Sequence, residues 1–178
     1  CNNLANSFRS AQILRNGFYV AISGYPNSGK STLFNTLLKK KRSIVSDIPG
    51  TTRDYIEDTF YINQIPVKLI DTAGLRSSDD FVEIEGIKMA ESILEQADLN
   101  LIINDISISD ENSSKLFTEI KNKFPTSVTI LIQNKIDKIS FTDDLRKDGI
   151  CYISAKQGIG IKELVNMIEK EANSSIVQ

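Results

Sequence analysis

The chain has 178 residues, which suits a single domain at roughly 100–200 residues per domain. Its 40% hydrophobic and 25% charged residues are typical of globular proteins, so the collagen-like, disordered and coiled-coil classes are excluded. Histidine is absent, which excludes Ser-His-Asp and Cys-His catalysis and zinc sites that need histidine. The net charge of −2 argues against a domain built mainly to bind nucleic acid.

The two cysteines, Cys1 and Cys151, stand far apart in the chain without metal-ligand spacing, which favours a reducing, cytoplasmic location. Charged residues interrupt every apolar stretch well before the roughly 18 residues that a membrane helix needs, and the N-terminus has no signal pattern. We therefore expect no contact with a membrane. Because the chain begins with Cys1 rather than Met, we also expect it to be part of a longer protein.

The spacing of apolar residues predicts a strand at 18–23 and a helix at 31–38. Two strands at 55–62 and 65–71 follow, and the two residues between them, Asn63 and Gln64, suit a hairpin. The remaining predicted elements are a helix at 82–96, a strand at 99–103, a helix at 109–124, strands at 128–132 and 151–153, and a helix at 161–172.

The alternation of strands and helices predicts a three-layer α/β fold, in which a mixed, mostly parallel six-stranded sheet carries helices on both faces. Ligands of such sheets bind beyond the carboxyl ends of the strands, so the loops there are the candidate site. Residues 1–16 stand outside the alternation and are interpreted as the remnant of a flanking helical domain. Residues 17–173 form the predicted domain, and residues 174–178 are interpreted as a C-terminal tail.

Residues 24–31 read GYPNSGKS and match the P-loop pattern G-x-x-x-x-G-K-[ST], between a predicted strand and a predicted helix. The glycines let backbone N–H groups point at phosphate oxygens, and the helix that follows adds its partial positive charge. Lys30 can reach the β and γ phosphates of a nucleotide, and the Ser31 hydroxyl can ligate Mg²⁺. The expected nucleotide contacts of this segment are Asn27, Ser28, Gly29, Lys30, Ser31 and Thr32.

Residues 71–74 read DTAG at the end of a predicted strand. Asp71 can hold Mg²⁺ there through its water shell, and Gly74 can offer its N–H to the γ phosphate. Residues 50–54 read GTTRD and lie between the first helix and the hairpin, where a threonine can bind Mg²⁺ and the γ phosphate and leave them after hydrolysis. Thr52 is the predicted ligand.

Residues 134–137 read NKID and residues 154–156 read SAK, each shortly after a predicted strand. The Asp137 carboxylate can accept hydrogen bonds from the N1–H and the 2-amino group of guanine, a pair of donors that adenine lacks. Sites that bind a substrate group in this way reject analogues without it by about 10⁴–10⁵. The Ala155 N–H can donate to guanine O6, and the Lys135 stem can lie over the ring. The predicted base-binding residues are Asn134, Lys135, Asp137, Ser154, Ala155 and Lys156.

The position after D-x-x-G lacks a group that can orient water. Ras-type enzymes carry a glutamine there that orients the attacking water, whereas this chain has Leu75. The run of basic residues at 39–42 fits the negative end of a helix dipole, with nucleic-acid contact as the alternative. The acids nearest to Leu75 are, from the sequence alone, typical of a solvated helix start; they are Asp79, Asp80, Glu83 and Glu85.

Four stretches together resemble one family, the tRNA-modification GTPases called MnmE or TrmE, within the TrmE-Era-Der group of P-loop GTPases. The stretches are residues 24–31, 44–54, 71–76 and 82–87, and the resemblance covers about residues 12–172. The first two stretches are shared with the ribosome-assembly GTPases Era and Der, whereas the last two distinguish the MnmE family. One departure is Phe81, where the family often has a polar or acidic residue.

The resemblance implies a GTP-binding domain at residues 17–173 that hydrolyses GTP to GDP and phosphate and dimerises through its nucleotide faces. It implies stimulation by K⁺, with Asn27, Ser46, Ile48 and Thr51 as K⁺ ligands, and Ser31 and Thr52 as Mg²⁺ ligands. It implies a water-positioning role for Glu83, beside Thr52 and Gly74 in the catalytic set. The full-length protein would work in the cytoplasm with the flavoprotein MnmG on wobble uridines of tRNA.

Two alternatives stay open. The chain could belong to an Era-like or Der-like ribosome-assembly GTPase. Alternatively, it could be a nucleotide-binding interaction module with negligible turnover, because Leu75 replaces the glutamine.

Overall fold

A computed structural model of the chain describes residues 12–13, 15–41, 56–72, 80–108 and 111–177. The six strands are β1 (Phe18–Gly24), β2 (Ile56–Ile62), β3 (Ile65–Asp71), β4 (Leu99–Asp105), β5 (Val128–Asn134) and β6 (Ile150–Tyr152). The helices are α2 (Lys30–Lys41), α3 (Asp80–Gln96), α4 (Glu111–Lys123) and α5 (Ile161–Val177), with short 3₁₀ turns η2 (Ile136–Lys138) and η3 (Asp143–Leu145). The predicted alternation of strands and helices is confirmed.

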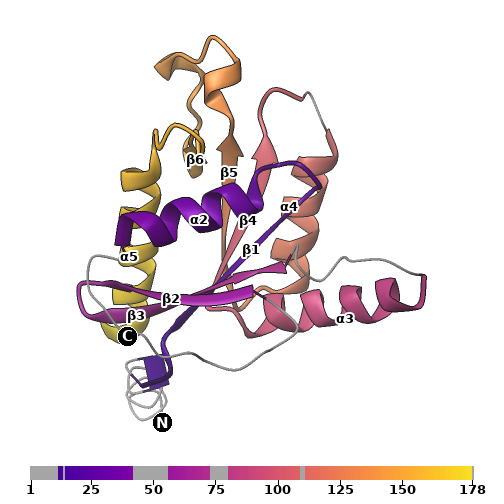
Figure 1. Cartoon of the computed structure of the whole chain (residues 1–178), viewed down its shortest axis with the longest axis vertical. Helices are drawn as coiled ribbons and strands as arrows, with labels where there is room; N and C mark the ends of the chain where they lie inside the picture. The colour runs from indigo at the N-terminus through magenta and orange to yellow at the C-terminus, as the bar shows by residue number, and fades with distance from the viewer. Residues whose placement is uncertain (1–11, 14, 42–55, 73–79, 109–110, 178) are drawn as a thin grey trace.

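The strands form one sheet in the order β2-β3-β1-β4-β5-β6. β2 runs antiparallel to β3, and the pairs from β3 to β6 are parallel. The predicted mixed, mostly parallel six-stranded sheet is therefore confirmed. The carboxyl ends of the parallel strands β1, β3, β4 and β5 lie at one edge of the sheet (Figure 1).

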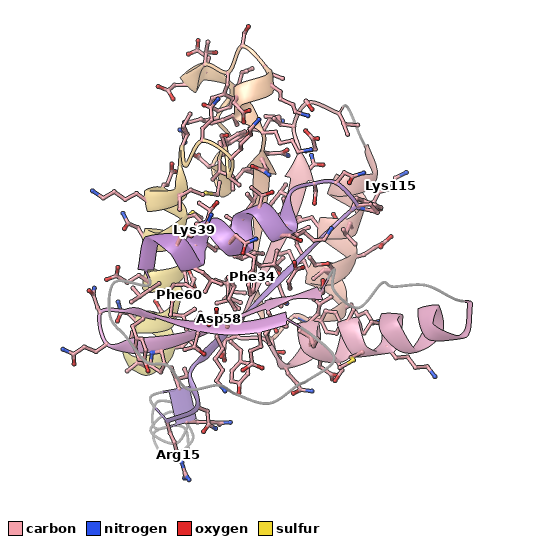
Figure 2. All side chains as sticks on the ribbon, viewed as in Figure 1. Arg15, Phe34, Lys39, Asp58, Phe60 and Lys115 are labelled. Atoms are coloured by element: carbon pink, nitrogen blue, oxygen red, sulfur yellow. The ribbon has the colours of Figure 1, made fainter. Side chains whose placement is uncertain are left out.

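Side chains that alternate along the strands fill two separate cores. In β4, Leu101 and Ile103 pack with α2 and α5, whereas Ile102 packs with α3 and α4. Figure 2 marks Phe34 of α2 and Phe60 of β2, which are both buried in the first core. Because both faces of the central strands are covered by helices, these strands are almost continuously apolar.

The predicted two-residue hairpin is confirmed. Asn63 and Gln64 both have positive φ angles, of 46° and 71°, and Ile62 pairs with Ile65. Two central residues with positive φ are typical of the type I′ turn, whose twist matches that of the flanking strands. The Asn63 amide donates to the Glu169 carboxylate, so the tip of the hairpin is bonded to α5.

The two ends of the chain depart from the predicted outline. α5 was expected to end near residue 172 but continues to Val177, so residues 174–177 extend the helix. At the other end, Ile13 is buried in the first core, and its carbonyl accepts a hydrogen bond of 2.8 Å from the Gly17 N–H. The division of the chain at residues 16 and 173 stays a prediction.

Strands β4 and β5 run two residues further than the apolar pattern predicted, to Asp105 and Asn134. These two polar residues are partners in the parallel register of the two strands. The sheet itself therefore places Asp105 beside the segment predicted to bind the base.

Candidate nucleotide-binding site

The predicted P-loop connects β1 to α2, and its two glycines are required by close contacts. A Cβ atom on Gly24 would lie 2.3 Å from the Ile103 carbonyl oxygen, and one on Gly29 would lie 2.3 Å from Asn134 Nδ2. Both contacts are far too short for a side chain. Gly29 also has a φ of 103°, and Asn27 has a φ of 63°, so the loop turns sharply before the helix begins.

The Lys30 ammonium folds back over this loop. Its Nζ donates to the carbonyl oxygens of Gly24 at 2.9 Å and of Tyr25 at 2.7 Å, and the residue is only 8% exposed. A cation held at the mouth of the loop, beside the N-terminus of α2, is suited to bind the phosphates of a nucleotide.

Two of the predicted Mg²⁺ residues meet directly. Ser31 Oγ, at the start of α2, donates to Asp71 Oδ2 at the end of β3, over 3.1 Å. Asp71 is 2% exposed, and the next residue, Thr72, is fixed by a hydrogen bond of 2.8 Å to the Ile22 carbonyl. A hydroxyl beside a single carboxylate is the hard oxygen set that holds Mg²⁺ together with substrate phosphates. These residues therefore fit the predicted ion.

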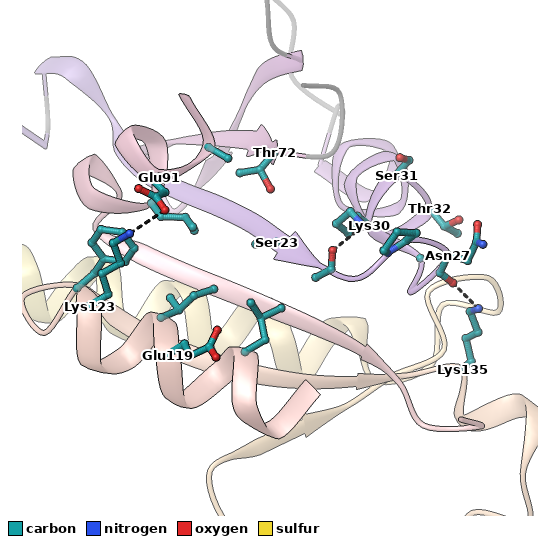
Figure 3. A pocket seen from close by; sticks show the side chains of 18 residues that line it. Ser23, Asn27, Lys30, Ser31, Thr32, Thr72, Glu91, Glu119, Lys123 and Lys135 are labelled. Carbon is teal, nitrogen blue, oxygen red and sulfur yellow. Dashed lines mark hydrogen bonds and ion pairs between the residues drawn. The ribbon is translucent and has the colours of Figure 1, made fainter. Parts of the chain in front are cut away.

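A cavity of about 830 Å³ opens beside the P-loop and extends between α3 and α4 (Figure 3). Lys30, Ser31 and Thr72 line one end of it. The other end has an apolar floor and an ion pair of 2.7 Å between Lys123 and Glu91 at its rim. This second part was not foreseen, because its residues are typical of ordinary helix faces in the sequence. Its apolar members are Ala90, Leu94, Leu116, Ile120 and Phe124.

Asn134 joins the P-loop to the S-A-K loop. Its Nδ2 donates to the Ser28 carbonyl over 2.8 Å, and its Oδ1 accepts from the Ala155 N–H over 3.0 Å. Residues 106 positions apart in the chain are thereby bonded through one buried amide. The Ala155 N–H, which was predicted to reach guanine O6, is thus bonded to Asn134 in this structure.

The other base-binding residues surround this junction. Asp137 lies exposed in the first turn of η2 and Lys156 is exposed, whereas Ser154 is fully buried. The Ser154 hydroxyl accepts from the Gln157 N–H at 3.2 Å. Thr36 of α2 donates to the Ala155 carbonyl at 3.0 Å, which is a further link between the helix of the P-loop and the S-A-K loop.

Lys135 has a partner that sequence reasoning missed. Its Nζ donates to Asp105 Oδ2 at 2.5 Å and to the carbonyl oxygen of Asn27 at 2.6 Å (Figure 3 draws the second bond). Burial raises the pKa of the Asp105 carboxyl, but hydrogen bonds from Lys135 and Ser107 outweigh it and hold that pKa below its ordinary value. The segment around Asp105 carries no signal for this role, because only the register of β4 against β5 places Asp105 opposite Asn134.

Several predicted site residues lie outside the described residues. They are Ser46, Ile48, Thr51, Thr52 and Gly74. Glu83 belongs to α3, but its side chain is not among those described. The roles assigned to these residues stay predictions. Thr32 follows Ser31 in α2 and is exposed at the rim of the cavity.

The described residues contain neither a membrane-spanning helix nor a cluster of metal-ligating side chains. No helix among them is long and apolar enough to cross a bilayer. Among the same residues, no group of three or more His, Cys, Asp or Glu side chains gathers into a metal site.

This arrangement defines a P-loop nucleotide-binding domain. It consists of a strand, a glycine loop with a lysine, and a helix, with a carboxylate at the end of the neighbouring strand. A sequence profile of the family described as "50S ribosome-binding GTPase" matches residues 19–135, and the chain belongs to that family. It is therefore a GTPase domain.

Similar proteins agree with this assignment. The tRNA modification GTPase MnmE of Carboxydothermus hydrogenoformans is 43% identical over 174 residues, covering 93% of this chain and 37% of that protein. MnmE of Flavobacterium psychrophilum is 41% identical over 182 residues, covering 98% of this chain and 39% of that protein. The chain thus spans about two fifths of the length of these relatives. The crystal structure of Aquifex aeolicus Era bound to GDP and AlF4⁻ has a TM-score of 0.67 and 34% identity, covering 86% of this chain and 56% of that one.

Proposed function

We propose that this chain is the GTP-binding domain of a tRNA-modification GTPase and that it hydrolyses GTP with Mg²⁺ and K⁺. The observation that carries the proposal is the junction at Asn134, which bonds the P-loop and the S-A-K loop into one site. Phosphate-binding and base-binding segments are thereby held at a fixed spacing, as recognition of a whole guanine nucleotide requires.

On the phosphate side, the Lys30 ammonium exchanges the carbonyl oxygens of Gly24 and Tyr25 for the β and γ phosphates. Ser31 and Asp71, with Thr52 as the expected third residue, would hold Mg²⁺. When bound, Mg²⁺ neutralises charge that develops on the phosphate oxygens.

On the base side, the Asp137 carboxylate is exposed and available to the two donors of guanine. The Ala155 N–H must turn from Asn134 Oδ1 or divide its hydrogen bond between that oxygen and guanine O6. Binding of the base then changes the same junction that joins the two loops.

Hydrolysis needs positive charge near the bridging oxygen and an oriented water, and Leu75 supplies neither. We assign the charge to K⁺, held by Asn27 with Ser46, Ile48 and Thr51, and the positioning of water to Glu83, with Thr52 and Gly74 beside the γ phosphate. The position of Asn27 in the P-loop, exposed and next to the phosphate-binding residues, supports its part in this set. A second copy of the domain facing the nucleotide would complete this set of K⁺ ligands and catalytic residues, so activation of hydrolysis accompanies dimerisation.

Work on tRNA is proposed from the MnmE relatives, whose names state tRNA modification. The longer protein would act in the cytoplasm, with the flavoprotein MnmG as its partner. An Era-like or Der-like role is the second candidate, since the similar Era structure shares 34% identity. The MnmE relatives share 43% and 41%, which favours the first.

Competition binding and turnover test the proposal together. The wild-type chain should bind GTP and GDP at least about 10⁴-fold more tightly than ATP. It should release phosphate faster in KCl than in NaCl, and more so at rising protein concentration. Equal affinity for ATP and GTP contradicts guanine recognition, whereas tight GTP binding with negligible turnover in both salts leaves the interaction module as the function.

A further inference from the structure

Asp105 is a buried carboxylate whose two oxygens serve different partners. Oδ1 accepts from the Ser107 backbone N–H at 3.0 Å and from the Ser107 hydroxyl at 2.6 Å. Oδ2 accepts from Lys135 Nζ at 2.5 Å. Ser107 therefore fixes the carboxylate, which leaves the other oxygen aimed at one lysine.

Lys135 itself adopts a backbone conformation that needs support. Its φ and ψ angles of 67° and 35° lie in the left-handed region, which costs energy for a residue with a side chain. Bonds on both sides hold the backbone there. The Asn134 carbonyl accepts from the Ile106 N–H at 3.0 Å, and the Ile136 N–H donates to the Ile153 carbonyl at 3.2 Å.

The lysine side chain spans from the base-binding segment to the P-loop. Its ammonium lies between the Asp105 carboxylate and the carbonyl oxygen of Asn27, 2.6 Å away. The carbonyl is neutral and the carboxylate is charged, so the stronger of the two bonds is the one to Asp105. The Lys135 side chain is 22% exposed and the Asp105 side chain is 8% exposed, so water screens this pair weakly.

We propose that Asp105 is a positioning residue for guanine nucleotides: it holds Lys135 against the P-loop and thereby sets how slowly GDP and GTP leave the site. This inference rests on the proposed guanine-nucleotide binding and deepens it. Asp105 acts through Lys135, so it should act on the affinity for both nucleotides.

Asp105→Asn is the first variant, because Asn keeps the shape and an oxygen for Ser107 but turns an amide group towards the Lys135 ammonium. The lysine then loses its anionic partner and moves into water, away from the P-loop. We expect GDP and GTP to dissociate about 10-fold to 100-fold faster, by equal factors, a range that corresponds to the coupling between residues in direct contact.

Ser107→Ala is the matched control, since it removes one hydroxyl bond to Asp105 but keeps the backbone bond and the ion pair. It should change nucleotide dissociation by less than about threefold, within the scatter of surface substitutions. A double-mutant cycle with Lys135→Ala separates positioning from general stability. In the Lys135→Ala background, Asp105→Asn should cause no further increase in the dissociation rate.

The readouts are stopped-flow dissociation of fluorescent GDP and GTP and the melting temperature without nucleotide. Equal acceleration by Asp105→Asn with and without Lys135, or an unchanged rate in the wild-type background, overturns the proposal. If Asp105→Asn does not fold, Asp105→Glu replaces it in the cycle, and its effect should again vanish in Lys135→Ala. Wild-type preference for GDP over ADP is measured alongside, because its absence contradicts guanine recognition itself and not the role of Asp105.

Discussion

Gly29→Ala tests the junction between the two nucleotide-binding loops. The new methyl group would lie 2.3 Å from Asn134 Nδ2, so Asn134 has to move away. Moving it breaks the bond of 2.8 Å to the Ser28 carbonyl and the bond of 3.0 Å from the Ala155 N–H. The backbone at this position, with φ of 103°, also disfavours a side chain.

Each of these three effects has a known order of magnitude. A residue with a side chain in a sparsely populated backbone region costs about 1–3 kcal/mol. Each buried partner left without its hydrogen bond, the Ser28 carbonyl and the Ala155 N–H, costs about 1–3 kcal/mol. The smallest sum is about 3 kcal/mol, which corresponds to more than a 100-fold change in an equilibrium constant. These costs are already present without nucleotide, so they lower the free energy of unfolding. Nucleotide affinity should fall as well, because the P-loop and the S-A-K loop are no longer bonded to each other through Asn134.

Titration calorimetry with GDP measures the loss of affinity, and thermal unfolding of the nucleotide-free protein measures the loss of stability. Gly149→Ala is the matched control, since this glycine also has a positive φ of 78° but nothing lies within 4 Å of its Cβ position. It should lower the unfolding free energy by about 1–3 kcal/mol and leave GDP affinity unchanged. If Gly29→Ala binds GDP as tightly as the wild type, Asn134 does not join the loops in the way described.

Further predictions concern the site residues and the buried thiol of β6. Lys30→Ala should abolish tight binding of triphosphate with an unchanged circular dichroism spectrum, and unchanged affinity would contradict the phosphate role. Asp137→Asn should lower GTP affinity by several kcal/mol, about 10²-fold or more, and favour xanthine nucleotides in competition binding. Glu83→Ala should lower single-turnover hydrolysis by about 10²–10⁴ with GTP binding and dimer mass retained, and Asn27→Ala should remove the response to K⁺; wild-type rates would refute each role. Burial raises the pKa of the Cys151 thiol to about 12, so in a Cys1→Ser variant thiol reagents at pH 8 should label it only on unfolding, and rapid labelling would contradict its burial.

The fold was predictable because apolar spacing and loop chemistry agree along the chain. The parallel strands, the two-residue hairpin and the order of the helices all follow from local patterns. The ends of elements were less predictable, since β4 and β5 continue through Asp105 and Asn134 after their apolar residues stop. Pairing with a neighbouring strand extends a strand there, and a single sequence does not show which residues become neighbours.

The candidate site was predictable to the extent that motifs carry it. Lys30, Ser31, Asp71 and Asn134 lie together as their motifs indicate. Asp105 was missed because nothing in its own segment marks it, and only the register of β4 against β5 brings it to Lys135. The bond between the Ala155 N–H and Asn134 is likewise a product of tertiary contact.

The two cores described above give the faces of the sheet unequal resistance to opening. Among the described residues, the core under α2 and α5 extends through all six strands up to Ala155, whereas the core under α3 and α4 is the smaller. Local unfolding needs less free energy where fewer apolar side chains are buried. Amides of α3 and α4 should therefore exchange with solvent sooner than those of α2 and α5. Exchange of the α2 amides then reports on the helix that follows the P-loop, and exchange of the α3 amides reports on the helix that carries Glu83.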